Sequence, residues 1–225
     1  EENQKKQIQF IASASHELRS PLAVILSSVQ AMESDWENAG RFLKTIKSEG
    51  DRMSRLIGDM LSLANADNKS WSIMKTDCEL DTLLLDTYEK YQPILHGKKI
   101  SLKVVLPEEP LSICKCDSAR ISQVLGILLD NGASYVSVGG RMEMGVKENE
   151  KYFQLYVQDN GPGISDENKE AVFRRFYRAD PARKEKKHFG LGLCIAREIV
   201  TLHKGSIRIL DTPGGGSTFV IRLPK

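Results

Sequence analysis

The sequence predicts an α+β protein, an antiparallel helical hairpin followed by a domain of mixed helices and strands. Apolar residues in the first third of the chain recur with the spacing of a coiled coil. After residue 70, short alternating runs mix with helical runs that do not strictly alternate with them, which favours helices layered on one face of a sheet. A length of 225 residues suits two modest domains. We therefore expect a hairpin over residues 1–66 and a second domain over residues 71–225.

The hairpin prediction rests on apolar residues that recur at intervals of three and four residues, as in a coiled coil. The first series is Ile8, Ile11, Leu18, Leu22, Ile25, Val29 and Met32, with Ser15 in the missing place. A break follows at Glu33–Gly40, and a second, wider stripe runs from Phe42 to Leu63. A wide stripe belongs to a helix that packs against more than one neighbour. Because two helices alone bury little surface, we expect two hairpins to pair as a four-helix bundle in a homodimer.

The second domain shows helical and strand patterns in alternation with turns. Helices are expected over 79–95, 118–135 and 190–203, the second of them capped by Asp117. Strands are expected over 100–106, 111–114, 141–147, 152–158, 206–210 and 218–223.

Composition excludes several classes of protein. A net charge of +2 gives no general case for a nucleic-acid or membrane-surface partner. No apolar run approaches the roughly 18 residues of a transmembrane helix, and residues 1–10 do not read as a signal peptide. The four cysteines lack the spacing of a zinc site, since Cys114-Lys115-Cys116 is one residue short of CxxC, so we expect reduced thiols.

His16 is the first candidate for chemistry. Ser15 occupies a position of the apolar series, which faces the second helix. His16, one residue later, should therefore lie beside this contact and toward solvent. A single exposed histidine is usually only a surface residue. Pro21, however, stands inside the same helix, where proline removes a backbone hydrogen bond and should bend the helix.

The thirteen residues from Phe10 to Leu22, FIASASHELRSPL, resemble the H box of two-component sensor histidine kinases. The resemblance implies that His16 is the phosphoacceptor and that Glu17 orients the imidazole and takes its proton. It also implies that Ser20, one turn beyond His16, positions water when the enzyme dephosphorylates its partner.

Four further motifs resemble the Bergerat-type (GHKL) ATP-binding fold of the same family. They are DNGPGI at 159–164, FRRFYR at 173–178, GLGL at 190–193 and GGGSTF at 214–219. The resemblance implies that Asp159 accepts a hydrogen bond from the adenine amino group, that Arg178 reaches the phosphates, and that the glycine boxes meet the nucleotide. The implied ATP-binding residues in these motifs are Asp159, Gly161, Gly163, Arg178, Gly190, Gly192, Leu193 and Thr218.

The stretch from Gln123 to Tyr135 resembles the N box, with departures. Asn131 keeps the asparagine expected to bind Mg²⁺ and phosphate, and Tyr135 keeps the aromatic residue beside the nucleotide. Ile127 replaces a second asparagine one turn earlier, and Ser134 replaces a lysine that usually meets phosphate. Because the side chains at 127 and 131 share one helix face, isoleucine removes a polar ligand there. We expect the changes to reduce activity.

Three functions follow from these motifs. The first is the core of a sensor histidine kinase that uses ATP and Mg²⁺ to phosphorylate His16 and then passes the phosphoryl group to a receiver-domain aspartate of a response regulator. The second is a kinase-impaired relative that acts as a response-regulator phosphatase or binding module. The third is a structural dimerisation module with a vestigial nucleotide fold. The resemblance also implies a cytoplasmic fragment of an inner- or plasma-membrane sensor, with any membrane segment located before residue 1.

Overall fold

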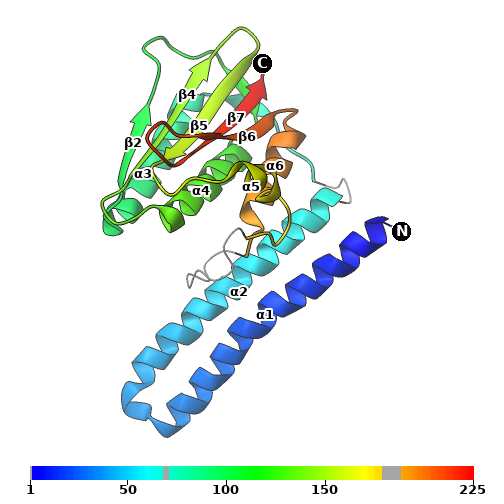
Figure 1. Cartoon of the computed structure of the whole chain (residues 1–225), viewed down its shortest axis with the longest axis vertical. Coiled ribbons are helices and arrows are strands. Elements are labelled where there is room, and N and C mark those ends of the chain that lie inside the picture. Colours follow the sequence, from blue (N-terminus) through cyan, green and yellow to red (C-terminus); the bar gives the residue numbers. More distant parts are fainter. Residues whose placement is uncertain (1, 68–70, 179–188) are drawn as a thin grey trace. The chain divides into compact units, whose positions relative to one another are not determined.

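The computed structural model describes residues 2–67, 71–178 and 189–225, and the chain forms two compact units. The first unit holds the two long helices together with residues 189–191, and the second holds the rest of the described chain from Ser72 on. Figure 1 shows the elements of both units.

The hairpin consists of α1 (Glu2–Ser34), the short 3₁₀ helix η1 (Trp36–Asn38) and α2 (Ala39–Asp67). The break falls inside the predicted interval, where the Asp35 carboxylate accepts hydrogen bonds from the backbone and side-chain amides of Asn38. Helix α1 continues through Pro21 as one helix, and Pro21 is buried against the hairpin.

The inner face of α1 lies one position before the predicted stripe. Ala14, Pro21 and Ser28, spaced by seven, are buried, whereas Ile11, Leu22 and Val29 remain exposed within one chain. Helix α2 repeats this arrangement. Its buried residues include Leu56 and Leu63, while Leu43, Ile57 and Leu61 are exposed. The hairpin therefore carries two apolar surfaces, and only one of them is used within the chain.

The second unit is built on a five-stranded sheet in the order β2-β4-β5-β7-β6. Its strands are β2 (Ser101–Val105), β4 (Arg141–Glu148), β5 (Tyr152–Asp159), β6 (Ser206–Asp211) and β7 (Ser217–Pro224). Strands β2 and β4 are parallel and the other pairs are antiparallel. A separate two-stranded sheet pairs β1 (Thr76–Cys78) with β3 (Cys114–Cys116).

Helices lie on one face of the large sheet (Figure 1). They are α3 (Leu80–Gly97), α4 (Ser118–Tyr135), α5 (Asp166–Ala171) and α6 (Gly192–Leu202). Side chains alternate between the two faces of the strands, and Met144, Leu155 and Phe219 lie in the core. Helix α4 contributes Leu125 and Leu129, which are also buried, to the same core. The α+β architecture predicted from the sequence is therefore confirmed.

Several element predictions need correction. The short strand expected at 111–114 lies at Cys114–Cys116 instead, because the backbone amide and hydroxyl of Ser112 bond to the side-chain carboxylate of Glu148 at the end of β4 and not to a neighbouring strand backbone. Strand β1 and helix α5 were not predicted, since both are too short to show a period. Helix α6 begins at Gly192, two residues later than expected, whereas α4 and its Asp117 cap agree with the prediction.

None of the helices in the described part of the chain is both long and apolar enough to cross a bilayer.

Candidate functional site

The H-box residues lie together on α1. His16 and Ser20 are exposed one turn apart, which agrees with the predicted exposure of His16. Glu17 is turned toward α2, where its Oε2 lies 3.9 Å from a guanidinium nitrogen of Arg52. Arg52 is 7% exposed and also pairs with Glu49 at 3.3 Å. The pair therefore ties the residue next to His16 to the second helix of the hairpin.

Asp159 is the centre of the second group of residues. It ends strand β5, is 7% exposed, and its Oδ1 accepts hydrogen bonds from the backbone amides of Gly161 at 2.8 Å and Ser217 at 3.3 Å. No described residue bonds to Oδ2 of this carboxylate. Burial raises the pKa of Asp159 above its ordinary value, and the two amides oppose that rise. One carboxylate oxygen is thus fixed by the fold, and the other is available to a ligand.

Glycines form the walls around Asp159. A Cβ added to Gly216 would lie 2.0 Å from the carbonyl oxygen of Asp159, and one added to Gly163 would lie 3.3 Å from the carbonyl oxygen of Gly216. A Cβ on Gly161 would meet Asp159 Oδ1 at 2.9 Å and the backbone of Tyr135 at 3.6 Å. Gly163 and Gly216 also have φ values of +79° and +106°, which favour glycine. The glycines at these places therefore let three backbone segments meet at one end of the sheet.

The end of α4 reaches the same place. A Cβ added to Gly132 would lie 3.8 Å from the Cβ of Asp159, and Tyr135 contacts the Gly161 segment as above. Thr218, next to Ser217, shares a 2.9 Å hydrogen bond with the buried Thr212. Strand β5, the β6–β7 turn and the C-terminal turn of α4 thus surround one carboxylate.

The N-box face of α4 points toward the start of α6. A Cβ added to Gly192 would lie 3.2 Å from Cγ2 of Ile127. Ile127 and Asn131 are both half-buried and stand one turn apart on the same face. A hydrocarbon side chain therefore lies against the amino-terminal end of α6, where backbone N–H groups suit an anion.

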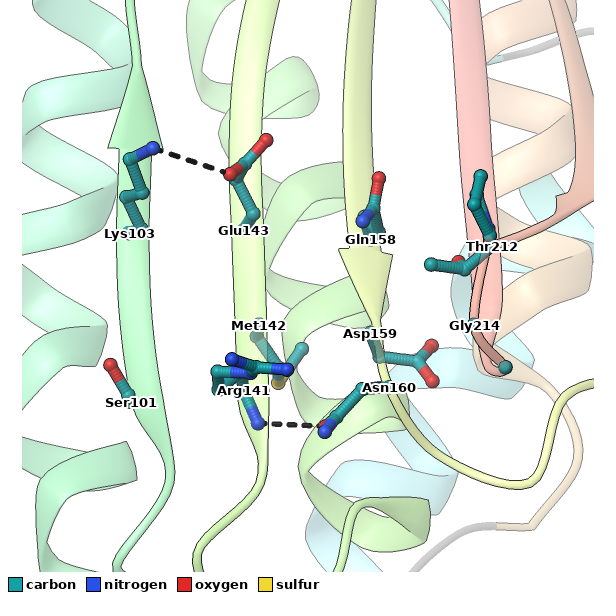
Figure 2. Close-up of a pocket in the computed structure, with 12 residues that line it drawn as sticks. Ser101, Lys103, Arg141, Met142, Glu143, Gln158, Asp159, Asn160, Thr212 and Gly214 are labelled. Atoms are coloured by element: carbon teal, nitrogen blue, oxygen red, sulfur yellow. Dashed lines mark hydrogen bonds and ion pairs between the residues drawn. The ribbon is translucent and has the colours of Figure 1, made fainter.

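A polar hollow of about 480 Å³ opens at the same end of the sheet (Figure 2). Its lining includes Lys103, Arg141 and Gln158, with Asp159 and the turn at Gly214 at its edge. Lys103 pairs with Glu143 at 3.7 Å, and the backbone N–H of Arg141 donates to Asn160 Oδ1 at 2.7 Å. The α4 residues are not part of this lining, so the hollow is separate from the N-box face.

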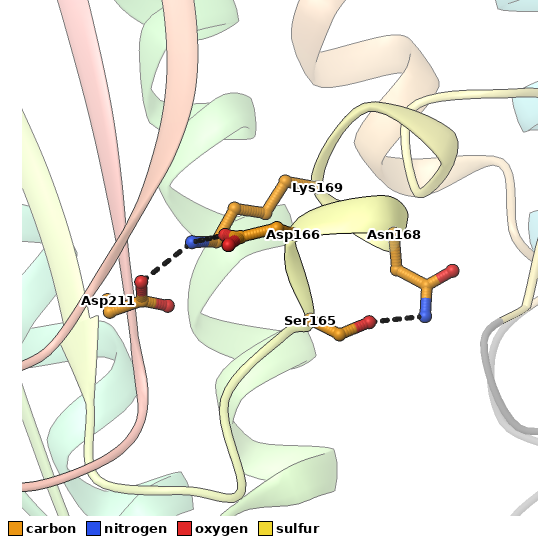
Figure 3. Close-up of polar contacts among 5 residues, drawn as sticks. All are labelled: Ser165, Asp166, Asn168, Lys169 and Asp211. Carbon is orange, nitrogen blue, oxygen red and sulfur yellow. Dashed lines mark hydrogen bonds and ion pairs between the residues drawn. The ribbon is translucent and has the colours of Figure 1, made fainter.

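The predicted F box follows α5, which is anchored to its neighbours. Lys169 Nζ lies 2.6 Å from Asp166 and 2.8 Å from Asp211 at the end of β6, and the side-chain amide of Asn168 donates to Ser165 Oγ (Figure 3). The hydroxyl of Tyr177 donates to Asn168 in turn.

Phe173 of the F box is buried against α6. The guanidinium of Arg197 lies 5.0 Å from the centre of its ring and also pairs with Glu170 at 3.3 Å. These contacts fix the beginning of the F box.

Two family models match the chain. The His Kinase A (phospho-acceptor) domain matches residues 6–69, and the histidine kinase-, DNA gyrase B- and HSP90-like ATPase matches residues 116–225. The chain belongs to the two-component sensor histidine kinases.

A curated relative agrees with this assignment, and two solved structures share the fold. The sensor histidine kinase WalK of Bacillus subtilis (strain 168) is 35% identical over 226 residues, which cover 96% of this chain and 36% of WalK. The chain therefore spans little more than a third of that relative's length. The histidine kinase ThkA, solved in complex with the response regulator TrrA, has the same fold, with a TM-score of 0.80, 23% identity, and coverage of 100% of this chain and 63% of that one. ShkA in complex with AMPPNP gives a TM-score of 0.73 at 22% identity over 96% of this chain and 45% of that one.

The structure of this histidine kinase brings most of the predicted nucleotide residues together. Tyr135, Asp159, Gly161 and Gly163 meet at the end of β5, and Thr218 stands beside Ser217 in the same group. Gly192 and the half-buried Leu193 open α6 opposite the N-box face, which carries Asn131.

Two predicted residues have no described contact to this group. Arg178 is half-buried at the end of the F box, and Gly190, with φ +74°, precedes α6. The adjoining basic segment 183–187 lies outside the described residues. His16, Glu17 and Ser20 belong to the other unit.

Sequence reasoning missed the residues that hold these groups in place. They are Arg52, which pairs with Glu17, Ser217, whose amide binds Asp159, and the Lys169–Asp211 pair. Ser217 follows three glycines, which indicate a tight turn. From that signal, a backbone N–H donor close to Ser217 could have been predicted. The two ion pairs join segments far apart in the sequence, and a single chain gives no signal for them.

Proposed function

We propose that this chain is the catalytic core of a sensor kinase, which binds ATP at the Asp159 end of the sheet and transfers its γ-phosphoryl group to His16. The phosphoryl group then passes to an aspartate in the receiver domain of a response regulator. The observation that carries the proposal is the arrangement at Asp159, where two amides bond to one carboxylate oxygen, glycines let the backbone close around it, and the second oxygen has no partner among the described residues.

The Asp159 carboxylate suits the amino group of adenine. A charged acceptor with one free oxygen binds an N–H donor more strongly than a neutral acceptor does, and hydrogen bonds to charged groups contribute about 1.5–3 kcal/mol. The glycine backbone at 161 and 163 lies next to the end of α4 that carries Tyr135, and we propose that this backbone and the aromatic ring of Tyr135 supply flat surfaces for the base. The N-terminus of α6 at Gly192 offers backbone N–H groups to the phosphates.

Asn131 fits Mg²⁺ as one oxygen ligand. Its side chain is half-buried on the N-box face, and amide and phosphate oxygens are the donors that Mg²⁺ takes. Ile127, one turn earlier, provides no donor. The ion would therefore be held by Asn131, the phosphates and water, and when bound it supplies charge that offsets the phosphate oxygens.

The transfer at His16 needs no further protein nucleophile. A ring nitrogen of His16 forms a bond to the γ-phosphorus, the bond from this phosphorus to the bridging oxygen breaks, and ADP leaves. Glu17, held by Arg52 beside the imidazole, takes the ring proton. The hydroxyl of Ser20 on the next turn is available to position water for a separate reaction, the dephosphorylation of the response regulator.

The exposed stripe of the hairpin is the surface for a second copy. Ile11, Leu22 and Leu26 on α1 are 46–57% exposed, and Ile57 and Leu61 on α2 are 46% and 61% exposed. Apolar stripes of this length on adjacent helices are covered in a four-helix bundle. We therefore propose a homodimer, which sedimentation equilibrium would detect as twice the mass of 25.2 kDa and which a purely monomeric mass would contradict.

Incubation with γ-labelled ATP and Mg²⁺ tests the proposed reaction. The chain should acquire label that is stable to base and labile to acid, as expected for a phosphorylated imidazole. His16→Gln should reduce labelling to background while leaving nucleotide affinity unchanged. Nucleotide binding without label in the unaltered chain would contradict kinase activity and favour the phosphatase alternative.

A further inference from the structure

Three of the four cysteines meet in the small two-stranded sheet. Cys78 on β1 pairs in register with Cys114 on β3, and Cys116 lies two residues further along β3 on the same face. All three are free thiols, and they are 8%, 1% and 1% exposed respectively. The cysteines that look scattered in the sequence therefore form one cluster.

The register selects one pair of the three for a covalent bond. Directly opposite residues of an antiparallel pair have Cα atoms about 4.5–5.5 Å apart, inside the range of about 4.4–6.8 Å found in disulfides. The diagonal pair Cys78–Cys116 corresponds to a separation of about 7–8 Å. Cys114 and Cys116 project in parallel from alternate positions of one strand, about 6.6 Å apart, close to the upper limit of that range. The Cys116 thiol shares hydrogen bonds with both Cys78 and Cys114, but its backbone is diagonal to the one and on the same strand as the other. Cys78 and Cys114 are the pair that fits.

The cluster also makes one of its thiols reactive. A hydrogen bond from the Cys116 thiol lowers the pKa of Cys114, and the charge of Lys75 adds to this effect. Burial is the largest influence on Cys78 and raises the pKa of that thiol. Since the thiolate is the nucleophile, Cys114 is the sulfur that reacts first. Within residues 2–67, 71–178 and 189–225, no group of three His, Cys, Asp or Glu side chains is arranged to hold a metal ion, so the cluster points to redox chemistry.

We propose that Cys78 and Cys114 form a modification site, a cross-strand disulfide produced by hydroperoxides. The Cys114 thiolate attacks the terminal oxygen of the peroxide, an S–O bond forms, the O–O bond breaks, and an alkoxide leaves, or hydroxide when the oxidant is hydrogen peroxide. The sulfur of Cys78 then attacks the sulfur of Cys114, the S–O bond breaks, and the departing hydroxide takes the Cys78 proton to form water. The peroxide is reduced by two electrons, and the two thiols supply them.

Two features of the small sheet matter for the proposal. One gives the peroxide access to the thiols, and the other links the disulfide to helix α4. Strands of three residues open locally more readily than the strands of a large sheet, and Cys78 is the most exposed of the three thiols. Cys116 is followed directly by Asp117, which caps α4 and also accepts a hydrogen bond from the amide of Met74. The disulfide would therefore fix the segment that leads into the helix carrying Asn131.

The test is exposure of the purified chain to hydrogen peroxide, followed by thiol counting and mapping of disulfides by mass spectrometry. Two of the four thiols should be lost, a peptide joining Cys78 to Cys114 should appear, and a thiol reductant should restore both. Cys194, buried alone on α6, offers the matched control, because Cys194→Ser should leave the bond and its rate unchanged. Cys78→Ser should abolish the bond, and Cys116→Ser should retain it but slow its formation several-fold.

Four free thiols after peroxide and after diamide would overturn the proposal. A bond mapped to Cys116 or Cys194 would overturn it as well, because it would contradict the register argument.

Discussion

The two chemical regions of this kinase core are built in opposite ways. On α1, thirteen consecutive residues of one helix carry the whole H box, and His16 is exposed. At the end of β5, Asp159 is buried, and its partners come from the following loop, from the β6–β7 turn and from the end of α4. A local site needs only a stable helix, whereas an assembled site depends on the packing of every segment that meets there.

This difference predicts how substitutions act. Changes at the exposed His16 and Ser20 should alter the reaction and leave folding intact, because these side chains have few contacts. Changes to the glycines that pack around Asp159 should lower stability together with ligand binding. The following substitutions test that contrast, from the largest expected effect to the smallest.

Gly216→Ala should be the most damaging change at the assembled site. Its Cβ would lie 2.0 Å from the carbonyl oxygen of Asp159, and its φ of +106° is unfavourable for alanine. Strain of about 1–3 kcal/mol adds to a clash of about 1–3 kcal/mol with backbone that cannot move aside.

Gly214→Ala is the matched control for that change. Gly214 has a similar φ of +86° but nothing within 4 Å of its added Cβ, so only the strain should remain. Urea denaturation of both variants measures the difference. Equal losses in the free energy of unfolding would show that close approach at Gly216 does not matter.

Asp159→Asn should separate binding from stability. The asparagine Oδ1 can still accept from Gly161 and Ser217, while the charge that binds the ligand is lost. ATP affinity should fall ~10- to 10²-fold, as expected for a hydrogen bond to a charged group.

The free energy of unfolding of this variant should stay the same or rise. Burial raises the pKa of Asp159, which means that the fold destabilises the charged form of this side chain relative to its protonated form, and asparagine removes that charge. Calorimetric titration with ATP and thermal unfolding give the two readouts. A variant that binds ATP normally would remove Asp159 from the proposed adenine site.

Ile127→Asn should improve the nucleotide site. It restores a polar ligand on the face of α4 that meets Gly192, and one added hydrogen bond of about 0.5–1.5 kcal/mol corresponds to a rise in ATP affinity of ~2- to 10-fold. Ile127→Val, which adds no polar group, should leave the affinity unchanged. An Ile127→Asn titration identical to that of the unaltered chain would show that the N-box interpretation is wrong.

The pH dependence of stability should report on His203. This side chain is 2% exposed, its Nε2 accepts from the backbone amide of Asp117, and its Nδ1–H donates to the carbonyl of Ile199. Burial holds the pKa of His203 below its ordinary value of 6.5. The unfolded chain therefore takes up the proton first as the pH falls, and the free energy of unfolding should decrease below about pH 6.5, by no more than about 1.4 kcal/mol per pH unit.

His203→Gln should flatten this dependence. His96→Gln, at an exposed position on α3, should not change it. The measurement is thermal unfolding between pH 5 and pH 8. An unchanged slope in His203→Gln would assign the dependence to other groups.

What the sequence predicted follows the same division between local and assembled features. Local signals predicted α4 with its Asp117 cap, the helical hairpin, the exposure of His16 and the positions along the chain of the five strands of the large sheet. The sequence also shows the exposed apolar stripe of α1 as a periodic pattern. The prediction placed this stripe in the contact between α1 and α2, whereas Ala14, Pro21 and Ser28, one position earlier, make that contact. The Arg52–Glu17 pair, the Ser217 amide on Asp159 and the cysteine cluster join distant segments, and no local pattern encodes such contacts.

The most direct test of the central claim is to locate the phosphoryl group. The chain is incubated with Mg²⁺ and ATP, digested at neutral pH to protect phosphohistidine, and sequenced by tandem mass spectrometry. The account predicts one added phosphoryl group on His16 in the unaltered chain and a much smaller phosphorylated fraction of Asp159→Asn after the same time at an ATP concentration too low to saturate that variant. A phosphoryl group on another residue, or none on a chain that binds ATP, would contradict it.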